Sequence, residues 1–156
     1  PEKLLSTIRS RCQMVPFIRL NDNQINKIID KLEVFQEIDD IPHERIRELI
    51  DFSYGSPGRY LLNLQYWLSI SGPLRQKFEI KLTNRIELLQ LAKEITDELN
   101  IEQQLWLIDF QQNSAWMKER NSNMVKQLEE LRQQLLKYVQ PRLAWEISLL
   151  EINLFD

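Results

Sequence analysis

The sequence predicts an all-α protein, because almost every segment carries apolar residues at helical spacing and glycine is scarce. Only 3 of the 156 residues are Gly, against a usual ~7 % of residues, which argues against turn-rich β-sandwiches and barrels. The chain is 43 % hydrophobic and 28 % charged, a balance typical of a folded chain. No apolar run approaches the ~20 residues of a membrane helix, and a single Cys suits a reducing compartment. We therefore expect a helical, cytoplasmic protein that spans no membrane.

The N-terminal segment 1–20 differs from the rest of the chain in charge and in predicted structure. It holds four basic residues against one acidic residue, whereas the remainder carries a net charge of −6. Residues 2–11 have helical spacing and end in arginines, which are favourable at a helix C-terminus. Residues 12–20 are rich in Val, Phe and Ile around Pro16, which predicts a short exit strand. A lone strand needs sheet partners that this sequence does not contain, so we expect the chain to be the end of a larger α/β domain.

Three short helices are expected over 22–70. Residues 21–23 are N-cap candidates for the first, Pro42 lies near the start of the second, and Ser56 precedes the third. Residues 71–73, Ser-Gly-Pro, combine a C-cap glycine with a helix-stopping proline, which indicates a linker. Beyond it we expect a packed helical bundle, with helices near 74–81, 84–99, 101–118, 122–138 and 142–153.

Motifs for a self-contained active site are missing from the sequence. It has no GxxxxGK[ST], no GxGxxG, no HExxH and no CxxC pair. His43, the only histidine, is expected at the surface in the first turn of a helix, and Cys12 is expected to be a buried apolar residue. Glu129 and Glu130 are expected on a solvated helix face, and at least half of the four tryptophans in the core. We therefore expect no enzyme active site, cofactor or metal wholly within this chain.

Arg11 is the residue best suited to chemistry, because a guanidinium at a helix end can reach a phosphate across an interface. The stretch around it, PEKLLSTIRSRCQ, closely resembles PEKLLPTIRSRCQ of AAA+ clamp-loader subunits, with twelve of thirteen positions in agreement. The departure is Ser6, where Pro is usual. In that family the arginine of the Ser-Arg-Cys motif acts in trans on ATP bound by a neighbouring subunit. The resemblance implies this role for Arg11, with Ser10 and Cys12 supporting the turn around it.

Two further stretches resemble the same family. The three short helices look like the AAA+ lid, and Gly55-Ser56-Pro57-Gly58 lies where the family has a motif similar to GSLRDAL. Gly58 stands at the position of the sensor-2 arginine, and Arg59 follows one residue later, turned by ~100° on a helix. This pattern is similar to the delta-prime type of bacterial DNA polymerase III clamp-loader subunit, which does not hydrolyse ATP. The C-terminal QPRLAWEISLLEI resembles the family's last collar helix, commonly NPRLALExLLL.

The resemblance implies a C-terminal fragment of a clamp-loader subunit in three parts. These are the end of the AAA+ module in 1–20, an AAA+ lid in 21–72 and a helical-bundle collar in 73–156. The collar would join other clamp-loader subunits of the gamma/tau and delta types into a pentamer. The assembled complex would act with the sliding clamp and primer-template DNA in DNA replication. Arg11 would act on ATP that is bound by a neighbouring motor subunit. The chain itself would bind no ATP and would be non-catalytic.

Three other interpretations stay open at this point. The chain could come from a gamma/tau-type motor subunit whose sensor-2 arginine has moved to Arg59, which an intact phosphate-binding loop upstream would favour. It could be a helical nucleic-acid-binding regulator that uses the helices before residue 71 as a helix-turn-helix. Against this, residues 21–74 hold 5 basic and 9 acidic side chains, whereas a recognition helix needs basic flanks. The last alternative is a helical domain with a purely structural role.

Overall fold

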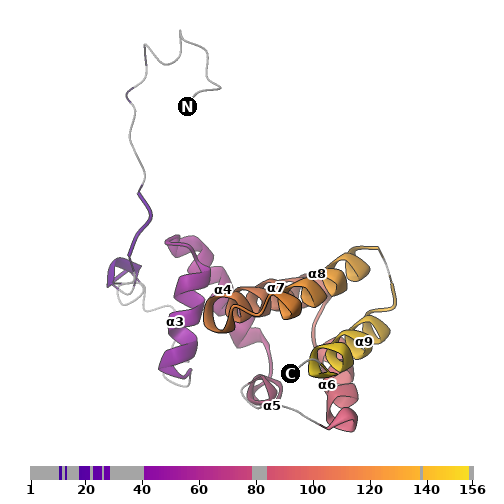
Figure 1. Cartoon of the computed structure of the whole chain (residues 1–156). Helices are drawn as coiled ribbons and strands as arrows, with labels where there is room; N and C mark the ends of the chain where they lie inside the picture. Colours follow the sequence, from indigo (N-terminus) through magenta and orange to yellow (C-terminus); the bar gives the residue numbers. More distant parts are fainter. Residues whose placement is uncertain are drawn as a thin grey trace.

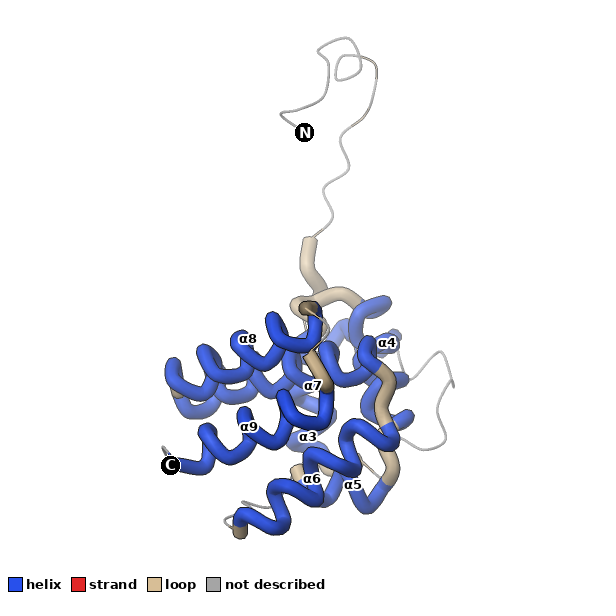
Figure 2. The backbone as a smooth tube through the Cα atoms, turned by 90° about the vertical axis from the view of Figure 1, so that its right-hand side faces the viewer, coloured by secondary structure: helices blue, strands red, loops and turns tan. Residues whose placement is uncertain are grey.

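All the regular secondary structure in the described part of the chain is helical (Figure 1). The computed structural model describes residues 11, 13, 18–21, 23–25, 27–28, 41–78, 84–137 and 139–154. Figure 2 shows these residues as helices joined by loops, which confirms the predicted all-α class for them. In chain order the helices are α3 (His43–Phe52), α4 (Pro57–Ser69), α5 (Gly72–Lys77), α6 (Arg85–Glu98), α7 (Ile101–Ser114), the π-helix η2 (Ala115–Glu119), α8 (Ser122–Leu136) and α9 (Pro141–Leu154).

The helices expected after residue 73 are confirmed where the structure describes them, with small differences at their ends. Residues 79–81 of the first and residue 138 of the fourth lie outside the described residues. The helix expected near 101–118 is one continuous run in which α7 passes into the π-helix η2. A π-helical turn has i→i+5 hydrogen bonds and often marks a functional part of a helix. Arg120 ends it in the left-handed conformation, with φ 52°.

The prediction of a C-cap glycine and a helix-stopping proline at the start of this region is wrong. Ser71 caps the N-terminus of α5, and its hydroxyl accepts a hydrogen bond from the Leu74 N–H at 3.3 Å. Gly72 and Pro73 form the first turn of that helix. Proline fits there because the first N–H groups of a helix have no intrahelical acceptor. Only Ile70 and Ser71 separate α4 from α5.

The exit strand expected over 12–20 is not formed by its described members, Gln13 and residues 18–20. A strand needs a partner with which to form a ladder, and the Leu20 N–H instead donates to the carbonyl oxygen of Gly55 at 3.1 Å. Of the helix expected over 2–11, the structure describes Arg11, which lies in a turn. The other positions of these two elements lie outside the described residues.

The three short helices expected over 22–70 are supported where the structure describes them. Asn21 and Gln24 form a reciprocal cap around the first helical residues. The Asn21 side chain accepts from the Gln24 N–H at 2.9 Å, and the Gln24 side chain accepts from the Asn21 N–H at 3.0 Å. The later part of this first helix lies outside the described residues. α3 begins directly after Pro42 and α4 directly after Ser56, as predicted.

One core connects the helices on both sides of residue 72. In Figure 1, α3 and α4 lie at one end of the molecule, α6 and α9 at the other, and α7 extends between them. α7 contacts α3 as well as α8, α8 packs on α9, and α9 packs on α6. A single cluster of buried apolar side chains includes members of α3, α4, α6, α7, α8 and α9. The division into 1–20, 21–72 and 73–156 remains a prediction.

Stacked aromatic rings form the centre of this core. Trp106 lies parallel to Phe110 with ring centroids 5.4 Å apart, and Tyr66 stacks on Trp106, also at 5.4 Å. Phe52 meets Phe110 edge-on at 5.6 Å, and Trp67 reaches the same ring at 5.9 Å. Each such pair stabilises a fold by about 0.5–1.5 kcal/mol in addition to the effect of burying the apolar area of the rings. We call these five rings the aromatic column; it joins α3 and α4 to α7.

The expectation that at least half of the tryptophans lie in the core is confirmed. Trp67, Trp106 and Trp145 are buried. Trp116, on η2, is 48 % exposed, and the guanidinium of Arg120 lies 5.2 Å from its ring.

Candidate functional site

Arg11 carries the most specific chemistry that the sequence predicts, and the structure leaves its side chain exposed in a turn. A guanidinium presents five N–H donors in a planar fork, which matches the oxygens of a phosphate. Ser10 and Cys12, its predicted supporting residues, lie outside the described residues. The role of Arg11 therefore stays a prediction.

The predicted lid motif forms the turn between α3 and α4. Two consecutive residues there, Tyr54 with φ 52° and Gly55 with φ 77°, have left-handed backbone conformations. Glycine adopts this conformation freely, whereas an aromatic residue is strained in it by ~1–2 kcal/mol. Strained residues of this kind persist where the surrounding structure holds them, often at functional positions.

The remaining motif residues begin α4 as predicted. The Ser56 hydroxyl caps the helix by accepting from the Arg59 N–H at 3.4 Å, and Pro57 is the first helical residue. A Cβ added to Gly58 would meet nothing within 4 Å, so this glycine faces open space. Gly58 therefore has no steric need for glycine, in contrast to Gly55.

Arg59, the expected sensor-2-like arginine, lies against an aromatic ring. Its guanidinium is 5.6 Å from the ring centroid of Tyr54, a favourable cation–π distance. The Tyr54 hydroxyl donates to the Asn113 side-chain oxygen at 3.2 Å. Tyr54 therefore connects Arg59 with α7. Nothing in the sequence marked Tyr54 or Asn113, because their contact depends on how the helices pack.

Gly55 also contacts the N-terminal segment. Besides the Leu20 hydrogen bond, its Cα lies so close to that segment that an added Cβ would be 2.7 Å from the Leu20 carbonyl oxygen and 2.8 Å from the Arg19 Cβ. The structure thus connects the turn at Gly55 to Leu20. Sequence analysis placed Leu20 at the end of a strand and did not predict this junction.

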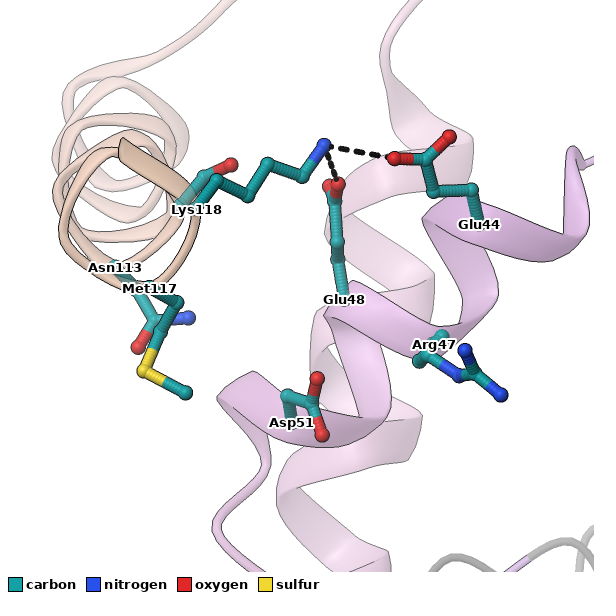
Figure 3. A pocket seen from close by; sticks show the side chains of 8 residues that line it. Glu44, Arg47, Glu48, Asp51, Asn113, Met117 and Lys118 are labelled. Carbon is teal, nitrogen blue, oxygen red and sulfur yellow. Dashed lines mark hydrogen bonds and ion pairs between the residues drawn. The ribbon is translucent and has the colours of Figure 1, made fainter. Parts of the chain in front are cut away.

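A cleft of ≈ 390 Å³ lies between α3 and the end of α7 with η2 (Figure 3). Lys118 reaches from η2 across the cleft to Glu44, at 3.1 Å, and to Glu48. The hydrogen bond that Lys118 donates to Glu48 is the main cause of a raised pKa of Lys118; burial acts in the opposite direction, and Glu44 adds to the increase. The cleft is lined by Glu44, Arg47, Glu48, Asp51, Asn113, Ser114, Met117 and Lys118.

Glu48 also connects this cleft with the aromatic column. It forms an ion pair with Arg45, which is only 7 % exposed. The Arg45 guanidinium lies 4.6 Å from the Trp67 ring centroid and 5.3 Å from that of Phe110. A buried arginine requires such partners, because an uncompensated charge in a core is costly. Sequence analysis missed this group; the spacing of Arg45 and Glu48 on one helix face was its only local sign.

The remaining expected residues have simpler environments. His43 is exposed at the first position of α3, and Glu130 is exposed on α8, as predicted. Glu129 has more partners than expected: it accepts hydrogen bonds from Gln133 at 2.8 Å and Gln112 at 3.4 Å, which lower its pKa in that order. Within the described ranges, no group of three or more His, Cys, Asp or Glu residues could hold a metal ion. No helix there is long and apolar enough to cross a membrane.

Comparison with known families gives the class of protein. Residues 23–152 match the family model described as cyanobacterial DNA polymerase III delta prime, C-terminal domain. The match defines the class as a helical domain of a DNA polymerase III subunit. The chain belongs to the delta prime C-terminal domain family, which confirms the predicted resemblance. Neither the curated proteins nor the solved structures include a match to the chain. The matched residues include the Gly55–Arg59 motif and begin after Arg11.

Proposed function

We propose that the chain acts within the DNA polymerase III clamp loader as the C-terminal part of its delta prime subunit. It would support assembly of the pentamer and donate Arg11 to ATP on a neighbouring motor subunit while the sliding clamp is loaded. The observation that carries this proposal is the family match over residues 23–152. The Ser-Arg-Cys resemblance, which precedes the matched residues, supports the role of Arg11.

Arg11 would act by stabilising negative charge. During hydrolysis, charge develops on the oxygens around the transferred phosphoryl group, and an arginine supplied by a neighbouring subunit accelerates such reactions by ~10³–10⁵. The exposure of Arg11 is consistent with a residue that must reach another subunit. Lysine would substitute poorly, because it lacks the planar fork of donors.

Assembly would use the C-terminal helices, where apolar side chains are exposed. On α9, Leu143 and Ile147 are 47 % and 43 % exposed and lie one helical turn apart. Ala144 and Trp145 occupy the buried side of the same helix. A helix with apolar residues on both sides is suited to contact its own core and a partner at once. Subunits of the gamma/tau and delta types would be those partners.

The chain itself would not hydrolyse ATP, in keeping with the delta prime type that its sequence resembles. Gly58 stands where a motor subunit has its sensor-2 arginine, and Arg59 lies over Tyr54. The alternative of a gamma/tau-type motor would require Arg59 to leave Tyr54 and reach a nucleotide. The family match favours the delta prime interpretation over this alternative and over a nucleic-acid-binding regulator.

Clamp- and DNA-stimulated ATP hydrolysis by the reconstituted clamp loader tests the role of Arg11. The full-length subunit would carry Arg11→Ala or Arg11→Lys, with Arg19→Ala as the control, since Arg19 is an exposed arginine of the same segment. We expect both Arg11 variants to lower turnover by about 10³-fold and the control to retain it. Unchanged turnover with Arg11→Ala would remove this arginine from the mechanism.

Co-elution of the reconstituted subunits tests the assembly role. The double change Leu143→Asp and Ile147→Asp should prevent the subunit from joining the complex, because it places charge on the proposed contact surface. Leu62→Asp is the matched control, since Leu62 is 47 % exposed on α4. Normal co-elution of the double variant would exclude this face of α9 from assembly.

A further inference from the structure

We propose that the cleft between α3 and η2 is a docking site for a basic side chain of another clamp-loader subunit. The occupant would be a lysine or arginine with an apolar neighbour in the partner's sequence. The inference rests on the proposed membership in a clamp loader and goes beyond it, because these helices differ from α9, whose exposed face is proposed for assembly.

The η2 side of the cleft exposes large apolar side chains. Met117, which lines the cleft, is 56 % exposed, and its neighbour Trp116 is exposed as well. The Arg120 guanidinium lies 5.2 Å from the Trp116 ring centroid, and Trp, Met and Arg are enriched in protein–protein interfaces. Arg120 also has a left-handed φ of 52° at the end of a π-helical turn, and both features often mark functional positions. This surface is therefore suited to a polypeptide partner.

The α3 side of the cleft is acidic. Glu44, Glu48 and Asp51 line it at the spacing i, i+4, i+7, which places them on one helix face. The lining holds three acidic and two basic side chains, and Figure 3 shows the Arg47 guanidinium pointing away from η2, whereas Lys118 reaches towards the carboxylates. The cleft is thus complementary in charge to a basic side chain.

Glu44 is the carboxylate that an incoming cation would take over. Its side chain is largely exposed, and its ion pair with Lys118 at 3.1 Å is a surface pair, which is readily exchanged because water screens it. The Glu48 side chain is mostly buried and also pairs with Lys118. Lys118 would therefore stay on Glu48 while Glu44 binds the cation of the partner.

The wall opposite these carboxylates suits the stem of the same side chain. Lysine and arginine have three or four methylene groups below the charged head, and the flexible thioether of Met117 adapts to irregular apolar contacts. The exposed Trp116 would contact the apolar neighbour of the basic residue. A cleft of ≈ 390 Å³ is large enough for such an anchor. The negative lining would repel the phosphates of DNA, so a basic polypeptide is the better occupant.

Photo-crosslinking in the reconstituted clamp loader, with the sliding clamp and primer-template DNA present, tests the inference. The full-length subunit would carry photoreactive benzoylphenylalanine in place of Met117. The matched control carries it in place of Leu62, an exposed apolar residue on α4. We expect the probe at Met117 to crosslink to another clamp-loader subunit, in a peptide where Lys or Arg adjoins an apolar residue. The probe at Leu62 should not label that peptide.

Charge reversal then tests the acidic wall. Glu44→Lys should lower the yield of the Met117 crosslink by ~10-fold, because like charges oppose each other at the contact. Glu44→Gln, which only removes the charge, should have a smaller effect in the same direction. Glu130→Lys is the matched control, since Glu130 is also an exposed glutamate that pairs with a lysine, Lys126, and it should leave the yield unchanged. Reversing the partner's basic residue to Glu should restore the yield in the Glu44→Lys background.

Several results would overturn the inference. A crosslink from Met117 to DNA, to the sliding clamp or to a second copy of this chain would identify a different occupant, and no crosslink at all would exclude docking. Equal effects of Glu44→Lys and Glu130→Lys would place the contact away from the acidic wall. With normal co-elution of the subunits, each of these results leaves the proposed function intact. Failure of the unmodified subunit to co-elute would instead contradict the proposed function, and the docking site with it.

Discussion

The indole N–H of Trp106 donates a hydrogen bond to the side-chain oxygen of Asn63 at 3.0 Å, and Asn63 is only 5 % exposed. The Asn63 amide nitrogen donates in turn to the Leu49 carbonyl oxygen at 3.4 Å. One asparagine on α4 thus has partners on both α3 and α7. Leaving such buried groups unpaired costs about 1–3 kcal/mol each, so this amide is important for joining the three helices.

Asn63→Ala should lower the free energy of unfolding by about 2–3 kcal/mol, since it leaves the Trp106 N–H unpaired and opens a small cavity. Urea unfolding followed by circular dichroism measures the change. Gln65→Ala, at an exposed position on the same helix, should stay within about 0.5 kcal/mol of the wild type. Adding Trp106→Phe to Asn63→Ala removes the unpaired donor. The free energy of unfolding of the double variant should therefore fall by less than the sum of the decreases in the two single variants. Strict additivity would contradict the hydrogen bond.

The two glutamates that contact Lys118 should differ in importance. The Glu48 side chain is 12 % exposed and also pairs with Arg45, whereas the Glu44 side chain is 78 % exposed. We expect Glu48→Gln to lower the free energy of unfolding by about 1–3 kcal/mol and Glu44→Gln by less than about 1 kcal/mol. Urea unfolding at neutral pH compares them. Equal decreases in the free energy of unfolding would mean that Glu48 contributes no more to stability than the exposed Glu44.

The raised pKa of Lys118 predicts a loss of stability at alkaline pH. Glu48 is the first cause of the increase and Glu44 a further one, so protonated Lys118 is favoured in the folded state. The stabilisation from protonated Lys118 is fully present below the pKa of about 10.4 that lysine has in the unfolded chain. It is lost as the pH rises through the higher pKa of Lys118 in the folded state. The stability difference between the wild type and Lys118→Met should stay constant from neutral pH to about 9 and shrink above 10.4. A difference that stays constant through this range would contradict the pairing.

Gly58→Ala should stabilise the protein by up to about 1 kcal/mol. Alanine restricts the unfolded chain and has a higher helix propensity, and the added Cβ meets nothing within 4 Å. Thermal unfolding of the purified protein should show a higher Tm than the wild type. A lower Tm would mean that this position has a neighbour.

The helices could be predicted from the sequence because their periodicity is local, and caps such as Asn21 and Ser56 mark their starts. The π-helix η2 could not, since its apolar spacing differs little from that of an α-helix. Gly72 was misinterpreted because a Gly-Pro pair stops one helix and starts another equally well. Of the candidate site, the resemblance predicted Arg11 and the Gly55–Arg59 motif, and their roles stay predictions. The Leu20 junction and the contacts of Tyr54 and Lys118 depend on long-range packing, for which the sequence has no local signal.

The aromatic column has a consequence for how this part of the chain can move. Tyr66 and Trp67 precede residue 72, and their ring partners Trp106 and Phe110 follow it. Cutting the chain at that position would deprive each half of its stacking partners, so neither half would retain a complete core. The helices on the two sides should therefore melt in one transition. A rotation of α4 alone would separate Tyr66 from Trp106 and Trp67 from Phe110, so we expect α4 and α7 to move together.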